Sequence, residues 1–95
     1  MVIIRIPTPL RGFVAGKDQV SVEGSTVKEA LDSLESQYPG IKSRLLDPAG
    51  EVRRFINLYV NETDVRSLQG LNSETKIGDA LSIIPAIAGG ARPWS

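Results

Sequence analysis

Apolar side chains recur at every second position near the start of the chain, which is the period of a β-strand. In the run VIIRIP, Val2, Ile4 and Ile6 share one face, and the prolines that follow end the run because proline cannot donate to a strand ladder. The alternation returns in QVSVEG, where Val20 and Val22 share a face. Since only the turn-rich segment LRGFVAGKD separates the two runs, we predict a hairpin of two strands.

The spacing becomes helical in STVKEALDSLESQYPG, and we predict a helix from Val27 to Gln37. Thr26 and Glu29 have the spacing of a capping box, and the tripeptide YPG ends the helix. The segment IKSRLLDPAGE that follows is expected to add one short helical turn. Apolar residues at intervals of three and four form the stripe that the helix buries: Val27, Ala30, Leu31 and Leu34.

Two further alternating runs complete the pattern. In VRRFINLYVNETDVR, Ile56, Leu58 and Val60 share one face, and an Asn-Glu turn leads into a short returning segment. In DALSIIPA, Leu81 and Ile83 share a face. Two strands, a helix and two or three more strands predict an α+β domain, in which a mixed sheet of four to five strands packs on one main helix.

A row of three carboxylates, Glu29, Asp32 and Glu35, follows the polar side of the predicted helix. Carboxylates at this spacing can form an acid–base pair or a metal site. The simpler interpretation, which we favour, is a solvated helix face.

The composition narrows the range of functions. The 95 residues include no Cys and no His, so the chain has no thiol nucleophile, no imidazole base and none of the usual zinc or haem ligands. Self-contained catalysis is therefore not expected, and we assign no catalytic residue and no metal ligand. Eleven Lys and Arg balance eleven Asp and Glu, so nothing favours a nucleic-acid or membrane partner. The sequence shows no leader pattern and no spanning stretch, and the expected location is the cytoplasm.

The stretch GDALSIIPAIAGG places a pair of glycines directly after the last predicted strand. Together with RFINLYVNETDVR, the later Gly70-Leu71 pair and the order of elements, it resembles the ubiquitin-like β-grasp sulfur carriers of the MoaD and ThiS family, most closely their CysO-like branch. The resemblance runs to Gly90. It implies a β-grasp domain over residues 1–86, a flexible Gly-Gly tail over 87–90 and an extension over 91–95.

In this family a partner enzyme uses ATP to adenylate the carboxylate of the last glycine, and sulfur then replaces one oxygen to give a thiocarboxylate. The resemblance therefore assigns sulfur attachment to Gly90. It implies that Ile87, Ala88, Gly89 and Gly90 thread into a partner's active site, where glycine suits a narrow passage because it has no Cβ. The carrier itself holds no permanently bound cofactor.

In this sequence Gly90 is followed by ARPWS, so its carbonyl belongs to an amide and cannot be adenylated. The resemblance implies a precursor that a JAMM-type metalloprotease, with zinc as its own cofactor, cuts between Gly90 and Ala91. Two alternatives remain: the five residues persist, or they are a remnant of an expression vector.

A second expected site is a docking surface on the sheet face away from the helix. Ile3, Phe55, Tyr59 and Ile84 fall on that face, and Pro85 is expected to mark the point where the tail leaves the sheet. Alternatively, the 41–50 segment or the 67–76 loop covers this face, or the residues are scattered.

The resemblance implies a carrier that donates sulfur in cysteine or related sulfur amino-acid biosynthesis. The expected partners are an adenylating enzyme of the MoeB or ThiF type and a pyridoxal-phosphate-dependent enzyme like cysteine synthase. The alternative acceptor is the large subunit of molybdopterin synthase, which would make this chain the small subunit. Two other classes remain: a ubiquitin-like modifier joined to lysine through Gly90, and a binding module whose tail is never processed.

Overall fold

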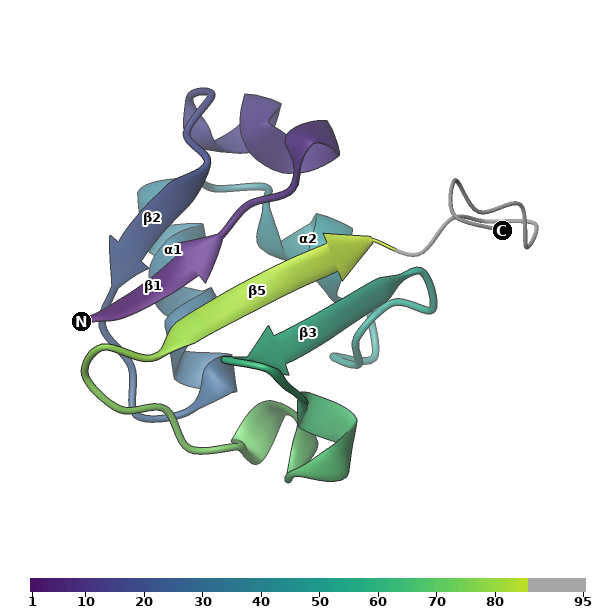
Figure 1. Ribbon diagram of the computed structural model, residues 1–95. Helices are drawn as coiled ribbons and strands as arrows, with labels where there is room; N and C mark the ends of the chain where they lie inside the picture. The colour runs from purple at the N-terminus through teal and green to yellow at the C-terminus, as the bar shows by residue number, and fades with distance from the viewer. Residues whose placement is uncertain (86–95) are drawn as a thin grey trace, which may run out of the picture.

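The alternating runs fold into one mixed sheet of five strands, and helix α1 (Val27–Gln37) covers one of its faces (Figure 1). The computed structural model describes residues 1–85. In the spatial order β2-β1-β5-β3-β4, the strands are β1 (Val2–Arg5), β2 (Gln19–Val22), β3 (Ile56–Val60), β4 (Thr63–Asp64) and β5 (Ala80–Pro85). The other helices are α2 (Lys42–Leu45) and the 3-10 helices η1 (Thr8–Val14), η2 (Val65–Ser67) and η3 (Gly70–Asn72).

Strand β5 lies at the centre of the sheet. It runs parallel to β1, with Leu81 opposite Ile4, and antiparallel to β3, with Ile83 opposite Leu58. Parallel neighbours need a long connection, and α1 lies within the one that joins these two strands. The predicted hairpin is confirmed, since β1 and β2 pair antiparallel with Val20 opposite Ile4.

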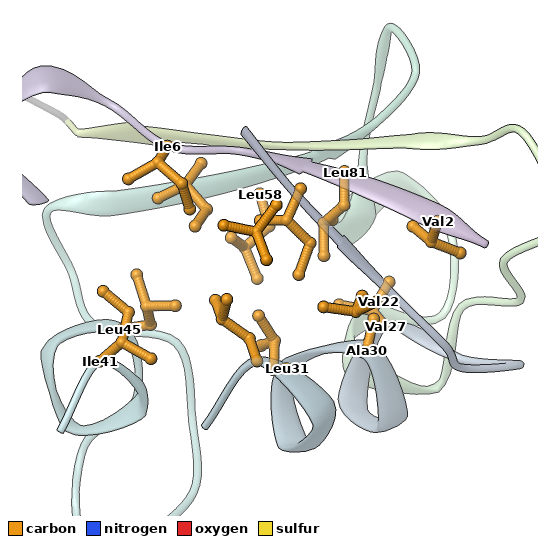
Figure 2. Close-up of a cluster of buried hydrophobic side chains, with 14 of the residues drawn as sticks. Val2, Ile6, Val22, Val27, Ala30, Leu31, Ile41, Leu45, Leu58 and Leu81 are labelled. Carbon is orange, nitrogen blue, oxygen red and sulfur yellow. The ribbon is translucent and has the colours of Figure 1, made fainter. Parts of the chain in front are cut away.

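The core fills the space between the sheet and the two α-helices. Figure 2 shows side chains from the sheet pointing toward those of α1 and α2. Each buried Leu or Ile of this kind contributes about 1.5–3 kcal/mol relative to an exposed one. The residues predicted to share a face within each alternating run are all buried: Val2, Ile4, Ile6, Val20, Val22, Ile56, Leu58, Val60, Leu81 and Ile83.

Helix α1 begins and ends where the sequence predicts, and its cap differs in one detail. The Thr26 Oγ1 accepts a hydrogen bond from the Glu29 N–H at 3.2 Å, as in a capping box. The Glu29 carboxylate, however, accepts from the N–H of Ser25 at 2.8 Å and so reaches one residue further back. Both bonds satisfy donors that the helix itself cannot pair.

Two connecting segments carry more structure than their turn residues predict. The segment between β1 and β2 forms η1, with a proline in its first turn, where a missing N–H costs little. Its Val14 is buried in the core. The 41–50 segment supplies the expected helical turn as α2 and buries Ile41, Leu45 and Leu46 on the helix side. Within residues 1–85, none of the helices has the length and apolar character required to cross a bilayer.

Gly24 lies against the backbone of α1, so we predict that it is sensitive to substitution. A Cβ at Gly24 would lie 2.6 Å from the Ala30 nitrogen and 2.9 Å from its Cα. Because neither atom belongs to a flexible side chain, Gly24→Ala should push β2 away from α1 and lower the free energy of unfolding by about 1–3 kcal/mol. Urea unfolding followed by circular dichroism measures this loss.

Gly12→Ala is the matched control, because a Cβ there meets nothing within 4 Å. Its free energy of unfolding should stay within about 0.5 kcal/mol of the parent chain. Equal stability of the two variants would contradict the close approach of β2 to α1.

Candidate functional site

The chain leaves the described structure at the end of the central strand. Pro85, the last residue of β5, is in register with Ile56 of β3. The tail and processing residues predicted from the sequence lie outside the described residues: Ile87, Ala88, Gly89, Gly90 and Ala91. The structure therefore locates the origin of the tail, and the exit of the chain after Pro85 stays a prediction.

The sheet face opposite α1 carries exposed apolar side chains beside this end of β5. Ile84 is 44% exposed and stands opposite Asn57, and Phe55, just before β3, is 50% exposed. Tyr59 is half-buried and lies opposite Ser82. These three residues share the predicted face, and Ile84 and Phe55 lie nearest to the end of β5.

Ile3 shares this face without joining the same cluster. It is half-buried and pairs with Ala80, at the start of β5, whereas Ile84 lies four positions further along the strand. At about 3.3 Å per residue this separates the two positions by roughly 13 Å. The predicted docking set therefore spans the length of β5, and the part beside the tail consists of Phe55, Ile84 and Pro85.

The two segments considered as covers lie elsewhere. The 41–50 segment packs into the core on the helix side through Ile41 and Leu45. The 67–76 loop contacts α1 through η3 and is fixed by Ser73 and Thr75, whose hydroxyls donate to the carbonyls of Gly70 and Gly24. Both interpretations in which a described segment hides the exposed face are therefore wrong.

A polar network that the sequence reasoning missed borders the same face. The Arg66 guanidinium donates to Asn57 Oδ1 at 2.8 Å and to both carboxylate oxygens of Asp64, at 2.9 and 3.2 Å. The hydrogen bonds that Asp64 accepts from the Arg66 side chain and from the Arg66 backbone N–H hold the pKa of Asp64 below its ordinary value. The spacing of Asp64 and Arg66 at the start of η2 is the only sequence signal for this network.

The carboxylate row of α1 has structural partners. Glu29 binds the Ser25 N–H, and Asp32 pairs with Lys42. Glu35 accepts hydrogen bonds from the N–H groups of Gly40 and Lys42, which hold its pKa below the ordinary value. Across residues 1–85 no group of three or more acidic side chains could hold a metal ion. These contacts support the interpretation of a solvated, structural helix face.

The sequence matches the model of the ThiS family over residues 4–90. The chain belongs to the ThiS family. The match ends at the second glycine of the Gly-Gly pair and leaves residues 91–95 beyond it. Both the predicted family and the predicted ubiquitin-like β-grasp fold are confirmed.

Individual relatives are similar to this chain over 72% to 95% of its length. The sulfur carrier protein CysO of Mycobacterium tuberculosis is 44% identical over 91 residues, which cover 94% of this chain and 98% of the relative. A chain of the Amycolatopsis orientalis BexX/CysO complex is 48% identical with a TM-score of 0.89, covering 95% of this chain and 100% of that chain. Small archaeal modifier protein 3 of Haloferax volcanii is 38% identical over 68 residues, 72% of this chain and 73% of the relative.

The Asp64 network predicts a specific change in titration. In Arg66→Gln the carboxylate of Asp64 loses its cationic donor, so its pKa should rise toward the ordinary value of 3.8. A carboxyl-carbon NMR titration between pH 2 and pH 6 measures the shift. Arg54→Gln removes a nearby arginine that donates no hydrogen bond to Asp64 in the structure, and it should leave this titration unchanged.

The same network contributes to the pH dependence of stability. Because the folded-state pKa of Asp64 is lowered, its contribution is fully present above about pH 5 and is lost as the pH falls below 3.8 through the folded value. The pH dependence of unfolding in Arg66→Gln should therefore be shallower below pH 4. Identical acid limbs for the two proteins would contradict this account.

Proposed function

We propose that this ThiS-family protein is a sulfur carrier that bears sulfur as a thiocarboxylate on Gly90 and donates it in cysteine or related sulfur amino-acid biosynthesis. The observation that carries the proposal is the family match over residues 4–90, which ends at the second glycine. The 44% identity to a sulfur carrier of the CysO type supports the amino-acid branch.

The proposed chemistry takes place at the end of the backbone. A carboxylate oxygen of Gly90 attacks the α-phosphate of ATP, which forms an acyl adenylate and releases pyrophosphate. A sulfide nucleophile then attacks the acyl carbon and expels AMP, which leaves the thiocarboxylate. The sequence contains no Cys and no His, so we assign both steps to the partner's active site and none of the catalytic groups to this chain.

The proposal requires at least two partner enzymes. One is an adenylating enzyme of the MoeB or ThiF type, which uses ATP, and the other is a pyridoxal-phosphate-dependent acceptor like cysteine synthase. The relative in the BexX/CysO complex was solved with a second protein, which supports a partner-dependent role. We propose that both enzymes receive the tail and contact the exposed face around Ile84 and Phe55.

The five residues after Gly90 add a processing step to the proposal. A JAMM-type zinc metalloprotease would hydrolyse the amide between Gly90 and Ala91, which exposes the carboxylate needed for adenylation. Activation of the carrier would then depend on the protease.

A second candidate function, protein modification, has an observation of its own. The 38% identity to a small archaeal modifier protein suggests that an activated Gly90 is passed to a lysine amine instead of to sulfide. The two functions share adenylation and differ in the nucleophile that expels AMP. An isopeptide bond between Gly90 and a lysine of another protein would identify the modifier.

Intact-mass spectrometry with fragmentation of the C-terminus tests the carrier proposal directly. Protein isolated from its own host should end at Gly90, with one oxygen replaced by sulfur in part of the population. Protein that always ends at Ser95, even during sulfur starvation, would contradict both processing and sulfur carriage.

Adenylation in vitro separates the role of the extension from the role of the domain. The chain ending at Gly90 should support ATP–pyrophosphate exchange by the adenylating enzyme of the same host. The 95-residue chain should support none, because its Gly90 carbonyl is an amide. Exchange at equal rates with both chains would overturn the precursor interpretation.

A charged residue in place of Ile84 on the exposed face is expected to weaken docking without unfolding the domain. Ile84→Asp places a charge beside the tail on a residue that is 44% exposed, so KM for adenylation should rise about tenfold or more. Ile77→Asp is the matched control, since Ile77 is 90% exposed and precedes β5 at its opposite end. Equal KM values for the two variants would exclude this face as the docking surface.

A further inference from the structure

The charges of this neutral chain are sorted between the two ends of the sheet. Five arginines lie at the end where β5 finishes, and we call them the exit rim: Arg5, Arg11, Arg44, Arg53 and Arg54. Lys17, Lys42 and Arg66 lie at the same end, and the carboxylates there are Asp18, Asp32, Glu35, Asp47, Glu51 and Asp64. Eight cationic side chains therefore stand beside six carboxylates where the tail begins.

Contacts connect the segments that carry Arg11, Arg44 and Arg53. The Arg11 Nε on η1 donates to the carbonyl of Ile6, just beyond β1, at 3.1 Å. The guanidinium of Arg44 on α2 lies 4.9 Å from the centre of the Phe13 ring on η1. The Arg53 Nε donates at 2.9 Å to the carbonyl of Ser43 on α2. In Figure 1, η1, α2 and the start of β3 all lie at the end of the molecule to which the β5 arrow points.

Uncharged groups hold three of the rim arginines in place, and within residues 1–85 none of the five forms an ion pair. Within residues 1–85 the ion pairs are Lys42 with Asp32 and Arg66 with Asp64, and neither involves a rim arginine. The groups that orient Arg11, Arg44 and Arg53 are two carbonyls and an aromatic ring, all of them uncharged. The carboxylate of Asp47 instead accepts from the backbone N–H groups of its own turn.

The opposite end of the sheet has the reverse balance. Its cationic side chains are Lys28 and Lys76. Five carboxylates lie there, on the segments that flank the start of β5 and the start of α1: Glu23, Glu29, Glu62, Glu74 and Asp79. The domain is therefore an electric dipole whose positive end surrounds the origin of the tail.

We propose that the exit rim docks on an acidic protein surface that borders the entrance to the partner's active site. The inference rests on the proposed function, because it assumes that the tail enters a partner. Arginine suits the role, since its planar guanidinium binds a carboxylate through two parallel hydrogen bonds. A pocket of about 240 Å³ beside the rim, lined by Arg53, Arg54 and Arg66 against the single carboxylate of Asp64, offers a seat for an aspartate or glutamate side chain.

The layout of the patch favours a protein over a nucleic acid. The exposed apolar residues Ile84 and Phe55 lie beside the charged rim, and an apolar centre with a polar border is the anatomy of a protein interface. A phosphate backbone is instead followed by an extended basic track on a chain of high positive charge, and this chain has no net charge. Charges placed in this way orient an approaching partner before contact and raise the association rate.

A peptide titration tests the rim without any partner enzyme. Hexaglutamate added to the isotope-labelled chain in low salt should shift the amide NMR signals of the exit rim and leave those of Lys28 and Lys76 in place. Absent shifts, or shifts centred on those two lysines, would overturn the proposal. Tighter binding of a single-stranded DNA hexamer than of hexaglutamate would overturn the assignment to a protein surface.

A charge-reversal pair tests the role of the rim in docking. Arg44→Glu with Arg54→Glu should lower kcat/KM for adenylation about tenfold or more at low salt, through KM, and the defect should shrink in high salt, where exposed charges are screened. Lys28→Glu with Lys76→Glu changes the net charge equally at the opposite end and should stay within about twofold of the parent. Urea unfolding verifies that both variants are folded.

The two tests fail in distinguishable ways. The adenylation assays of all variants use the chain that ends at Gly90. If this chain without further substitution is never adenylated, the proposed function is contradicted, and the hexaglutamate titration still decides whether the rim binds an acidic peptide. If the parent is adenylated and both double variants behave alike, the exit rim has no part in docking and this proposal is overturned.

Discussion

Strand β5 pairs with β1 on one side and with β3 on the other, and both the core and the placement of the tail depend on these two ladders. The parallel ladder joins residues near the two ends of the chain, such as Ile4 and Leu81, so it forms only when the intervening segments are folded. Its long connection carries α1 across the sheet, where the helix buries Leu31 and Leu34. The same pairing places Pro85, the last described residue, in the middle of the strand order.

The two faces of the sheet have different properties. The face toward α1 is filled by aliphatic side chains and supplies stability. The opposite face remains open, and its apolar residues are densest near Pro85, where the Gly-Gly tail follows. The proposed function would use this combination, because rigid packing positions Pro85 and an exposed surface allows another protein to bind beside it.

The arginines of the exit rim lie beside that surface. An exposed ion pair contributes little to stability, so the chain loses little by leaving the rim arginines without carboxylate partners. Orienting them with carbonyls and a phenylalanine ring keeps their charge available to another molecule. The proposed carrier, which would meet more than one enzyme, would gain from these charges, since electrostatic attraction speeds encounter without requiring tight and lasting binding.

Elements that depend on local periodicity and local chemistry could be predicted from the amino-acid pattern. The alternation of Ile56, Leu58 and Val60 predicted a strand, the stripe from Val27 to Leu34 predicted the helix to the residue, and the glycine pair with its preceding motif led to the family. Neighbours across the sheet could not be predicted in this way: Ile3 lies at the far end of β5 from Ile84, and Arg66 contacts Asn57. Arginines from four separate segments gather around the end of one strand. A period of two or 3.6 assigns residues to a face, whereas neighbours across strands depend on the register, and the register is set only when distant segments pair.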